Sequence, residues 1–174
     1  MEHPSKSQLR KLIGIGNYQF GKRVGSILFD GKVLVECSRR TGRIRHIYLR
    51  RTLIATLRPK DGFLALTPHG AKVILSRIKV PPNLVIVDES VADAIRLGGD
   101  VFAKHVVRAD LDLRPGEEVI VTDSQGVLLG VGSAVLAGHE MTMFKRGVAV
   151  NLRRGVDEVE HARKEAAGTQ TELL

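Results

Sequence analysis

Residues 114–135 read RPGEEVIVTDSQGVLLGVGSAV, in which two apolar runs are each preceded by a turn. The turns are Arg114-Pro115-Gly116 and Ser124-Gln125-Gly126, residue types that favour tight chain reversals. Similar short runs occur on both sides, namely LVIVDES (84–90), VFAKHVV (101–107) and VAVNLRRG (148–155). Many short strands joined by glycine-containing turns predict a small β-barrel for the second half of the chain.

Two short helices are expected within this barrel. Ser90 is a candidate cap for a helix over VADAIRLGG, which Gly98-Gly99 would end. HEMTMFKRG (139–147) predicts a second helical segment before the last strand.

The first half predicts helices that flank a four- or five-stranded antiparallel sheet. Ser7 is expected to cap a helix from Gln8 to about Phe20, and Thr67 is expected to cap one that starts at Pro68. Turns are indicated by Asp30-Gly31, Thr41-Gly42 and RPKDG (58–62). The expected strands are SILF (26–29), KVLVECS (32–38), RIRHIYL (43–49), TLIATLR (52–58) and FLALT (63–67).

The segment Lys79-Val80-Pro81-Pro82 is the expected domain boundary, because two prolines end a helix and stiffen a linker. It divides the chain into a basic α+β domain (1–78), a barrel domain (79–156) and an acidic, polar tail (157–174) whose first part can form a helix. The predicted fold class is therefore α+β, with an antiparallel sheet followed by a β pseudobarrel.

Positive charge is concentrated in the first half. The chain of 174 residues has a formal net charge of +8. Residues 1–78 hold 16 Lys and Arg against 4 Asp and Glu, a net +12, whereas residues 79–174 hold 11 against 15, a net −4. This asymmetry favours a polyanionic partner for the first half over a basic surface that is merely solvated.

Residues 37–51, CSRRTGRIRHIYLRR, carry six arginines among alternating apolar residues. Residues two apart on a strand share a face, so Arg43 and Arg45 are expected to project together and Ile44 the other way. Planar guanidinium groups suit phosphate oxygens, which favours phosphate contact over a solvated edge that only resists aggregation. The six arginines are Arg39, Arg40, Arg43, Arg45, Arg50 and Arg51.

The second half contains two glycine-adjacent basic segments, GGDVFAKHV (98–106) and KRGVAV (145–150). Glycine allows close approach of a ligand to the backbone and exposes N–H groups. The residues alone leave two readings equally open: a local binding patch, or glycines that only end a helix and turn the chain.

Other classes of site find little support. Cys37 is the only cysteine, which excludes an internal disulfide and fits a reducing, cytoplasmic setting. The six histidines lack metal-ligand spacing, so no metal or cofactor is expected. No nucleophile, base and orienting group occur together, although neighbouring cations could favour a reactive Cys37 thiolate over an inert thiol. No apolar run approaches the roughly 18 residues of a membrane span, and no secretory signal is apparent.

Several of these stretches resemble a known family. LVIVDES, the helix ending in GGD, VFAKHV, RPGEEVIVTD, VLLGVGSA, EMTMFKRG and VAVNLRR make residues 84–155 similar to a PUA domain, an RNA-binding pseudobarrel. NYQFG, LF, SRRTGRIR and ATLRPKDGFLALTPHGA make residues of about 10–78 resemble the domain that precedes PUA in archaeosine tRNA-guanine transglycosylase. The resemblance covers about nine-tenths of the chain.

The resemblance implies a pair of domains that grips tRNA and presents it to a separate catalytic barrel. That barrel, its aspartates and its zinc site have no counterpart in this sequence, which implies a protein that is not itself an enzyme. Carried over by position, the implied RNA contacts fall on the glycine loop and the last strands: Gly98, Gly99, Asp100, Val101, Phe102, Lys104, His105, Lys145, Arg146, Gly147 and Arg153.

The sequence thus predicts a noncatalytic RNA-binding protein, most specifically a tRNA-binding subunit of a split transglycosylase. The alternatives are a ribosome-associated or general structured-RNA-binding factor, a protein-interaction subunit with an acidic partner, and a small enzyme that uses Cys37 or a pair of acidic residues. An A-form stem is recognised by its shape, phosphates and 2′-hydroxyls, for which a row of arginines is suited.

Overall fold

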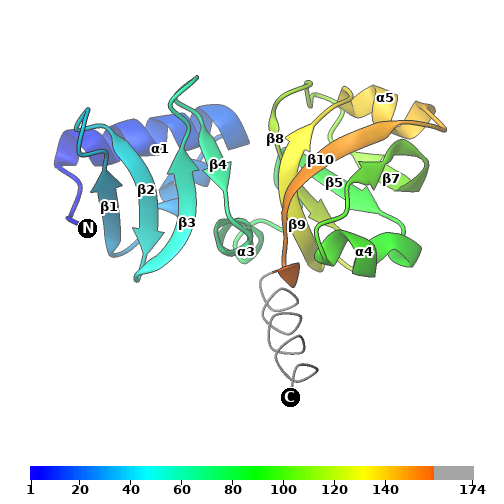
Figure 1. Ribbon diagram of the computed structural model, residues 1–174, viewed down its shortest axis with the longest axis horizontal. Coiled ribbons are helices and arrows are strands. Elements are labelled where there is room, and N and C mark those ends of the chain that lie inside the picture. The colour runs from blue at the N-terminus through cyan, green and yellow to red at the C-terminus, as the bar shows by residue number, and fades with distance from the viewer. Residues whose placement is uncertain (159–174) are drawn as a thin grey trace, which may run out of the picture. The chain divides into compact units, whose positions relative to one another are not determined.

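The structure is a computed structural model that describes residues 1–158. The chain divides into two units, with the boundary between Leu84 and Val85 (Figure 1).

A capping box starts the first helix. Helix α1 spans Lys6–Phe20. The Ser5 hydroxyl accepts from the Gln8 N–H at 3.2 Å, and the Gln8 side chain accepts from the Ser5 N–H at 2.8 Å. The prediction that Ser7 caps this helix was therefore wrong, since Ser7 lies in its first turn.

The segment SILF is helical, which corrects the prediction of a strand there. Its first three residues lie in α2, Val24–Leu28, and Phe29 is the C-cap residue; Val24 and Leu28 are buried. Gly16 of α1 faces Gly25 of α2: a Cβ added at Gly16 would lie 2.7 Å from the Gly25 Cα. The Asn17 side chain also accepts from the Gly25 N–H at 2.9 Å. These tertiary contacts hold a β-prone sequence in a helix, and Asp30-Gly31 joins α2 to the sheet instead of closing a hairpin.

The first unit contains the predicted antiparallel sheet, with four strands in the order β1-β2-β3-β4. Figure 1 shows α1 running across one face of it. The strands are β1 (Val33–Cys37), β2 (Ile44–Leu49), β3 (Thr52–Leu57) and β4 (Leu64–Leu66). Helix α3 (Pro68–Leu75) follows, and the Thr67 hydroxyl accepts from the Gly70 N–H at 3.2 Å, so the predicted cap is confirmed.

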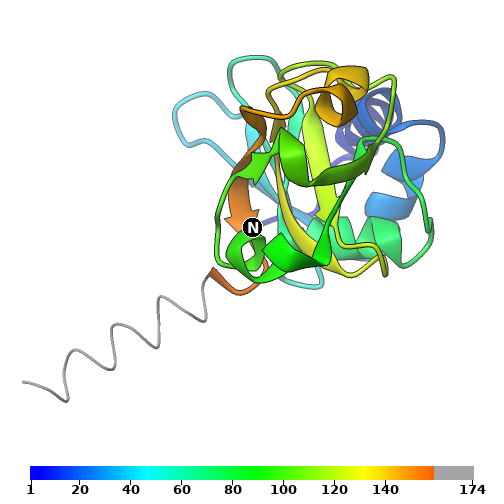
Figure 2. The same ribbon diagram turned by 90° about the vertical axis from the view of Figure 1, so that its right-hand side faces the viewer.

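The second unit wraps six strands around a core of small aliphatic side chains, in the order β6-β10-β9-β8-β5-β7 (Figure 2). This arrangement confirms the predicted α+β class, with an antiparallel sheet followed by a β pseudobarrel. The strands are β5 (Leu84–Val87), β6 (Val101–Phe102), β7 (Val106–Ala109), β8 (Glu118–Thr122), β9 (Leu128–Ala134) and β10 (Val148–Gly155). Helix α5 (Gly138–Met143) comes between β9 and β10 in the sequence.

Two local predictions in this unit were wrong. VFAKHVV is not one strand, because the 3-10 turn η2 (Ala103–His105) separates β6 from β7. Ser90 does not cap the short helix: the 3-10 turn η1 (Glu89–Val91) comes first and α4 (Ala92–Arg96) follows. The Asp88 side chain is the cap, and it accepts from the Ser90 N–H at 2.8 Å. The predicted helix in the tail falls largely on residues 159–174, outside the described residues.

The cap at Asp88 gives a prediction for stability against pH. Hydrogen bonds from Ser90, through its side chain and its backbone, lower the pKa of the Asp88 carboxyl. A pKa that is lower in the folded state stabilises the fold above the unfolded pKa of about 3.9, and this contribution is lost as pH falls through the folded pKa. We expect Asp88→Ala to lower the melting temperature at pH 7, and the difference from wild type to shrink below about pH 4.

Melting curves recorded by circular dichroism over a pH series measure this difference. Asp88→Asn is the matched control, because asparagine keeps an oxygen acceptor at the cap but does not titrate. A gap between wild type and Asp88→Ala that stays constant down to the lowest pH would contradict the ionised cap.

Candidate nucleic-acid interface

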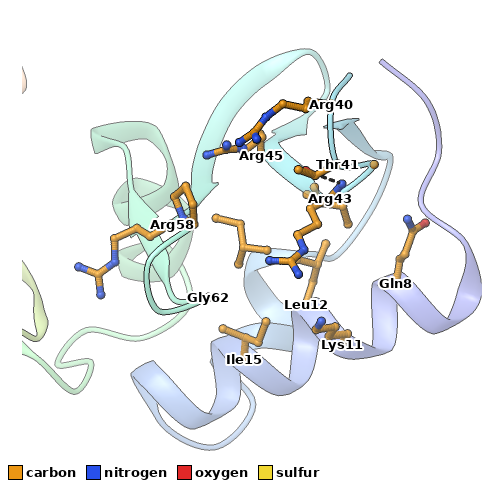
Figure 3. A pocket seen from close by; sticks show the side chains of 14 residues that line it. Gln8, Lys11, Leu12, Ile15, Arg40, Thr41, Arg43, Arg45, Arg58 and Gly62 are labelled. Atoms are coloured by element: carbon orange, nitrogen blue, oxygen red, sulfur yellow. Dashed lines mark hydrogen bonds between the residues drawn. The ribbon is translucent and has the colours of Figure 1, made fainter. Parts of the chain in front are cut away.

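The arginine-rich segment opens onto a pocket in the first unit, which we call the arginine pocket (Figure 3). Its cavity volume is about 580 Å³. Helix α1 forms one wall, and the loops before β2 and after β3 form the others. The lining residues are Gln8, Lys11, Leu12 and Ile15 from α1, residues 40–45, residues 57–59 and Gly62.

The two loops have the same hydrogen-bond pattern. In the first, the Ser38 N–H donates to the Arg43 carbonyl at 2.8 Å, and the Gly42 N–H donates to the Ser38 carbonyl at 2.8 Å. In the second, Arg58, Phe63 and Gly62 repeat these bonds at 2.8 and 2.9 Å. Both glycines have positive φ, +65° and +74°, which glycine adopts without strain. The loops are therefore fixed by their own backbones before any ligand arrives.

The side chains of Arg43, Ile44 and Arg45 do not alternate between the two faces of the sheet as in a regular strand. Ile44 pairs with Cys37 and His46 pairs with Glu36, so the register shifts by one residue and Arg45 is the extra residue of a β-bulge. Arg43, Ile44 and Arg45 consequently all line the pocket, which corrects the prediction that Ile44 points away from both arginines. Figure 3 shows Arg43 extending toward Leu12 and Lys11 of α1, while Arg40 and Arg45 extend along the opposite rim.

The positive charge at the pocket is little compensated. Glu36, the nearest acid in sequence, accepts from the Tyr48 hydroxyl at 3.0 Å and contacts His46 Nδ1 at 3.1 Å. The Tyr48 hydrogen bond is the main cause that lowers the pKa of Glu36. Among residues 1–158, none of the six arginines takes part in a salt bridge. Their mutual repulsion, about 1 kcal/mol per close exposed pair before screening, would be relieved by a bound polyanion.

The other predicted arginines lie apart from the pocket. Arg39 is exposed on the loop but does not line the cavity. Arg50 and Arg51 form the turn between β2 and β3, with φ of +48° and +70°. Residues other than glycine, asparagine and aspartate rarely adopt such positive φ angles, so this turn stores backbone strain. Arg40, Arg43 and Arg45 line one pocket from two sides, whereas Arg50 and Arg51 lie at the far end of β2.

The two glycine-adjacent segments of the second unit meet, and we call them the glycine-loop surface (residues 98–105 and 145–147). The Ala103 N–H donates to the Gly147 carbonyl at 2.9 Å, and Val148 pairs with Phe102. Phe102 is 46% exposed, and Lys104, Lys145 and Arg146 are exposed as well. The sequence placed these segments on one site, and the backbone pairing brings them together.

Some members of this surface also serve the fold. Gly98 and Gly99 end α4 by donating to the carbonyls of Ile95 and Ala94, at 3.0 and 2.9 Å. The Asp100 carboxylate accepts from the Leu152 N–H at 2.8 Å, and Val101 is buried. Both readings of the glycines, helix end and ligand approach, therefore remain compatible with the geometry. His105 is half-buried beside them.

Arg153 is engaged within the protein. Its guanidinium donates two hydrogen bonds to the carboxylate of Glu118, one of 3.0 Å from Nη1 and a shorter one from Nη2. The Glu118 side chain is fully buried, whereas that of Arg153 is 39% exposed. A buried carboxylate requires such partners. The role of Arg153 in RNA contact stays a prediction, and its role in neutralising Glu118 is visible in the fold.

The candidate thiol is not activated. Burial raises the pKa of Cys37, and a 3.6 Å hydrogen bond to Glu2 raises it further, so the thiol form is favoured at neutral pH. Within residues 1–158, no three His, Cys, Asp or Glu side chains gather as a metal site. The described part of the chain also contains no helix that is long and apolar enough to cross a membrane.

Comparison with known proteins accounts for both units. Residues 10–81 match the patch-forming domain C2 of tRNA-guanine transglycosylase, and residues 83–156 match the PUA domain. The chain is a C2 domain followed by a PUA domain. It is 39% identical over 152 residues to the tRNA-guanine(15) transglycosylase of Methanobrevibacter smithii and 40% identical over 159 residues to that of Thermococcus kodakarensis.

These matches cover 87% and 91% of the chain but only 23% and 27% of the two relatives, so the chain spans about a quarter of their length. It corresponds to their C-terminal region. Solved structures share the C2–PUA fold. A hypothetical protein from Pyrococcus horikoshii OT3 has a TM-score of 0.72 at 22% identity, covering 87% of this chain and 92% of that one. A PUA domain protein from Thermoplasma acidophilum has a TM-score of 0.66 at 21% identity, covering 88% and 92%.

Sequence reasoning missed two cations of the C2 arginine pocket, Lys11 and Arg58. Lys11 comes from α1 and Arg58 from the loop after β3, so only the folded sheet brings them to the arginine segment. Arg58 is partly neutralised by Asp61 at 3.1 Å. The equal length of the loops SRRTGR and RPKDGF is the one sequence signal that could have indicated two matching walls.

Proposed function

We propose that this C2–PUA chain binds structured RNA, specifically tRNA, and presents it to a base-modifying enzyme carried by another polypeptide. The observation that supports this most directly is the arginine pocket, a group of cations on hydrogen-bonded loops with little acidic compensation in a C2 domain. The tRNA-guanine(15) transglycosylases that match the chain make tRNA the favoured RNA.

The two units would contribute differently to binding. In the C2 domain, guanidinium groups carried on hydrogen-bonded loops suit phosphate oxygens bidentately and need no base readout. In the PUA domain, the glycine-loop surface offers exposed basic side chains beside Phe102, which suits an RNA end or stem. Affinity from phosphate contacts falls with salt, so the first test is a salt series.

The double variant Arg43→Ala/Arg45→Ala is expected to weaken tRNA binding and to reduce the slope of log K against log salt by about two, one for each lost phosphate contact. Fluorescence anisotropy of labelled bulk tRNA measures this, with a DNA duplex and a ribosomal RNA fragment as competitors. The matched control is Arg108→Ala/Arg114→Ala, which removes the same charge from the second unit and should leave most of the slope intact.

Each other outcome points to a different function. Equal binding to tRNA and the ribosomal fragment would favour a general or ribosome-associated RNA-binding factor. Negligible RNA binding at about physiological salt would favour the protein-interaction subunit. If the control pair lowers the salt slope as much as the Arg43/Arg45 pair does, the arginine pocket is not the main site of phosphate contact.

The catalytic step is assigned in this proposal to a partner, because the chain matches only about a quarter of the length of the transglycosylases. Affinity purification of the tagged chain is expected to recover a polypeptide with a transglycosylase-type catalytic barrel. If none is recovered, and tRNA base modification is unchanged in cells without the chain, the presenting role is wrong.

A further inference from the structure

The arginine pocket has an apolar interior that a phosphate grip does not require. Leu12 is buried, and Ile15, Ile44 and Leu57 lie around it between the cationic rim groups. Phosphates of a duplex could be held by arginines on a flat surface. This pocket is open to solvent on one side, and its volume of about 580 Å³ falls within the roughly 300–1,000 Å³ typical of small-molecule pockets, sufficient for a base and its sugar.

An exposed aromatic side chain lies one helical turn along α1 from a residue that lines this pocket. Tyr18 is 79% exposed, and its ring stacks on Phe63 with centroids 5.9 Å apart and an interplanar angle of 23°. Tyr18 follows the pocket residue Ile15 by about one helical turn, and Phe63 follows the pocket residue Gly62. Phe63 supports one face of the tyrosine ring, and the other face is available to a ligand.

Hydrogen bonds hold this aromatic pair in position. The Gln19 side-chain amide bridges both backbone groups of Leu64: it donates to the carbonyl at 2.9 Å and accepts from the N–H at 2.7 Å. The bridge ties the end of α1 to β4, and so places Tyr18 beside Phe63. The Asp61 carboxylate accepts from the Phe63 N–H at 3.0 Å and from Arg58 Nε at 3.2 Å, which fixes the loop below.

We propose that Tyr18 and the arginine pocket form a site for an unpaired nucleotide of the bound RNA. This inference rests on the proposed RNA-binding function. A base that has left its stack lies against Tyr18 or enters the apolar interior, and the phosphates on either side of it meet Arg43 and the rim formed by Arg40 and Arg45. The combination of an aromatic platform with a cationic groove is how single-stranded nucleic acid is held without base readout.

The charges and the platform together favour RNA over an acidic peptide. No acidic side chain is among the described residues that line the pocket, so the site suits any polyanion by charge. A peptide carboxylate, however, gains nothing from an exposed tyrosine ring, whereas every base has a face that can stack on it. The C2 domain would then select RNA with an unstacked nucleotide beside a stem, not a fully paired helix.

The test compares two RNA probes: a blunt duplex and the same duplex with a short single-stranded overhang. Wild type is expected to bind the overhang probe more tightly. Tyr18→Ala should lose this gain, by about 5- to 100-fold in affinity, because stacking on one aromatic has that value. Tyr18→Phe should retain the gain and Tyr18→Leu should lose it, since leucine keeps apolar surface but has no ring. The salt slope should stay unchanged in all three variants, since none alters a charge.

A second readout locates the nucleotide. RNA with 5-iodouracil in the overhang, cross-linked by light, is expected to attach to the tryptic peptide 12–22, which contains Tyr18. Equal binding of both probes, or a Tyr18→Leu variant that binds as wild type does, would overturn the nucleotide site. In that event a slope still reduced by the Arg43/Arg45 pair would leave the RNA-binding function standing, whereas failure of wild type to bind either probe would remove both.

Discussion

Gly25→Ala is expected to destabilise the C2 domain by about 2 kcal/mol or more, in the upper part of the range for overpacked cores. A Cβ at Gly25 would lie 2.1 Å from the Ile13 carbonyl oxygen and 3.0 Å from the Asn17 nitrogen. Both are backbone atoms of α1, so no side-chain rotation can relieve the clash. Helices α1 and α2 would have to separate, and the hydrogen bond from the Gly25 N–H to Asn17 would be strained or lost.

Gly14→Ala is the matched control on the same pair of helices and has the opposite expected sign. Gly14 lies within α1, and no atom comes within 4 Å of a Cβ built there. Alanine in an exposed helix interior is more stable than glycine by roughly 0.5–1 kcal/mol, so this variant should be stabilised.

Urea unfolding followed by tyrosine fluorescence measures both variants. The chain has two tyrosines and no tryptophan, and Tyr18 and Tyr48 both lie in the C2 domain, so the signal reports this unit. If Gly25→Ala unfolds at the same urea concentration as wild type, or if the unfolding free energies of both variants change in the same direction, the contact at Gly25 does not hold the two helices together.

This pair of variants also shows what local sequence patterns omit. Glycines at 14 and 16 look alike in sequence and argue against a helix, yet one is solvent-exposed and the other contacts Gly25. The same contact holds SILF as a helix where its β-branched and aromatic residues predict a strand. In both cases the deciding partner is distant in sequence, so local propensity is overridden.

Predictions from turn chemistry and capping were correct at some positions and wrong at others, since Ser7 and Ser90 are not the caps and Asp30-Gly31 closes no hairpin. Thr41-Gly42, the RPKDG turn and the Thr67-Pro68 helix start were located correctly, because each is determined by residues within a few positions of one another. The β-bulge at Arg45 was not predictable in this way, since it follows from how β2 pairs with β1. For the same reason the pocket positions of Lys11 and Arg58 were not predictable: tertiary packing brings Lys11 from helix α1 and Arg58 from the loop after β3.

Arg153→Met is expected to destabilise the PUA domain by at least about 2 kcal/mol. The substitution removes both hydrogen bonds that the guanidinium donates to the Glu118 carboxylate, whose side chain is fully buried. Breaking a buried ion pair from one side typically costs about 3–5 kcal/mol. A value toward the lower end is expected here, because the Arg153 side chain is 39% exposed and water can reach its place.

Arg154→Met is the control, with the same change of charge on the next residue of β10, where the side chain is exposed. Its stability should stay within about 0.5 kcal/mol of wild type, as for most surface substitutions. The double variant Glu118→Leu/Arg153→Met should recover much of the loss, because replacing both members of a buried pair by apolar groups is often close to neutral. Thermal unfolding by calorimetry supplies all four values.

The same variants separate two roles for Arg153, which the family resemblance places among the RNA contacts and the structure pairs with Glu118. A purely structural role predicts that the salt slope of tRNA binding is unchanged in Arg153→Met at temperatures where the variant is folded. A phosphate contact predicts that the slope falls by about one. Loss of stability together with an unchanged slope would remove Arg153 from the interface. The RNA contacts of the glycine-loop surface would then come from Phe102, Lys104, Lys145 and Arg146. Their side chains are exposed and, among the described residues, form no such internal ion pair.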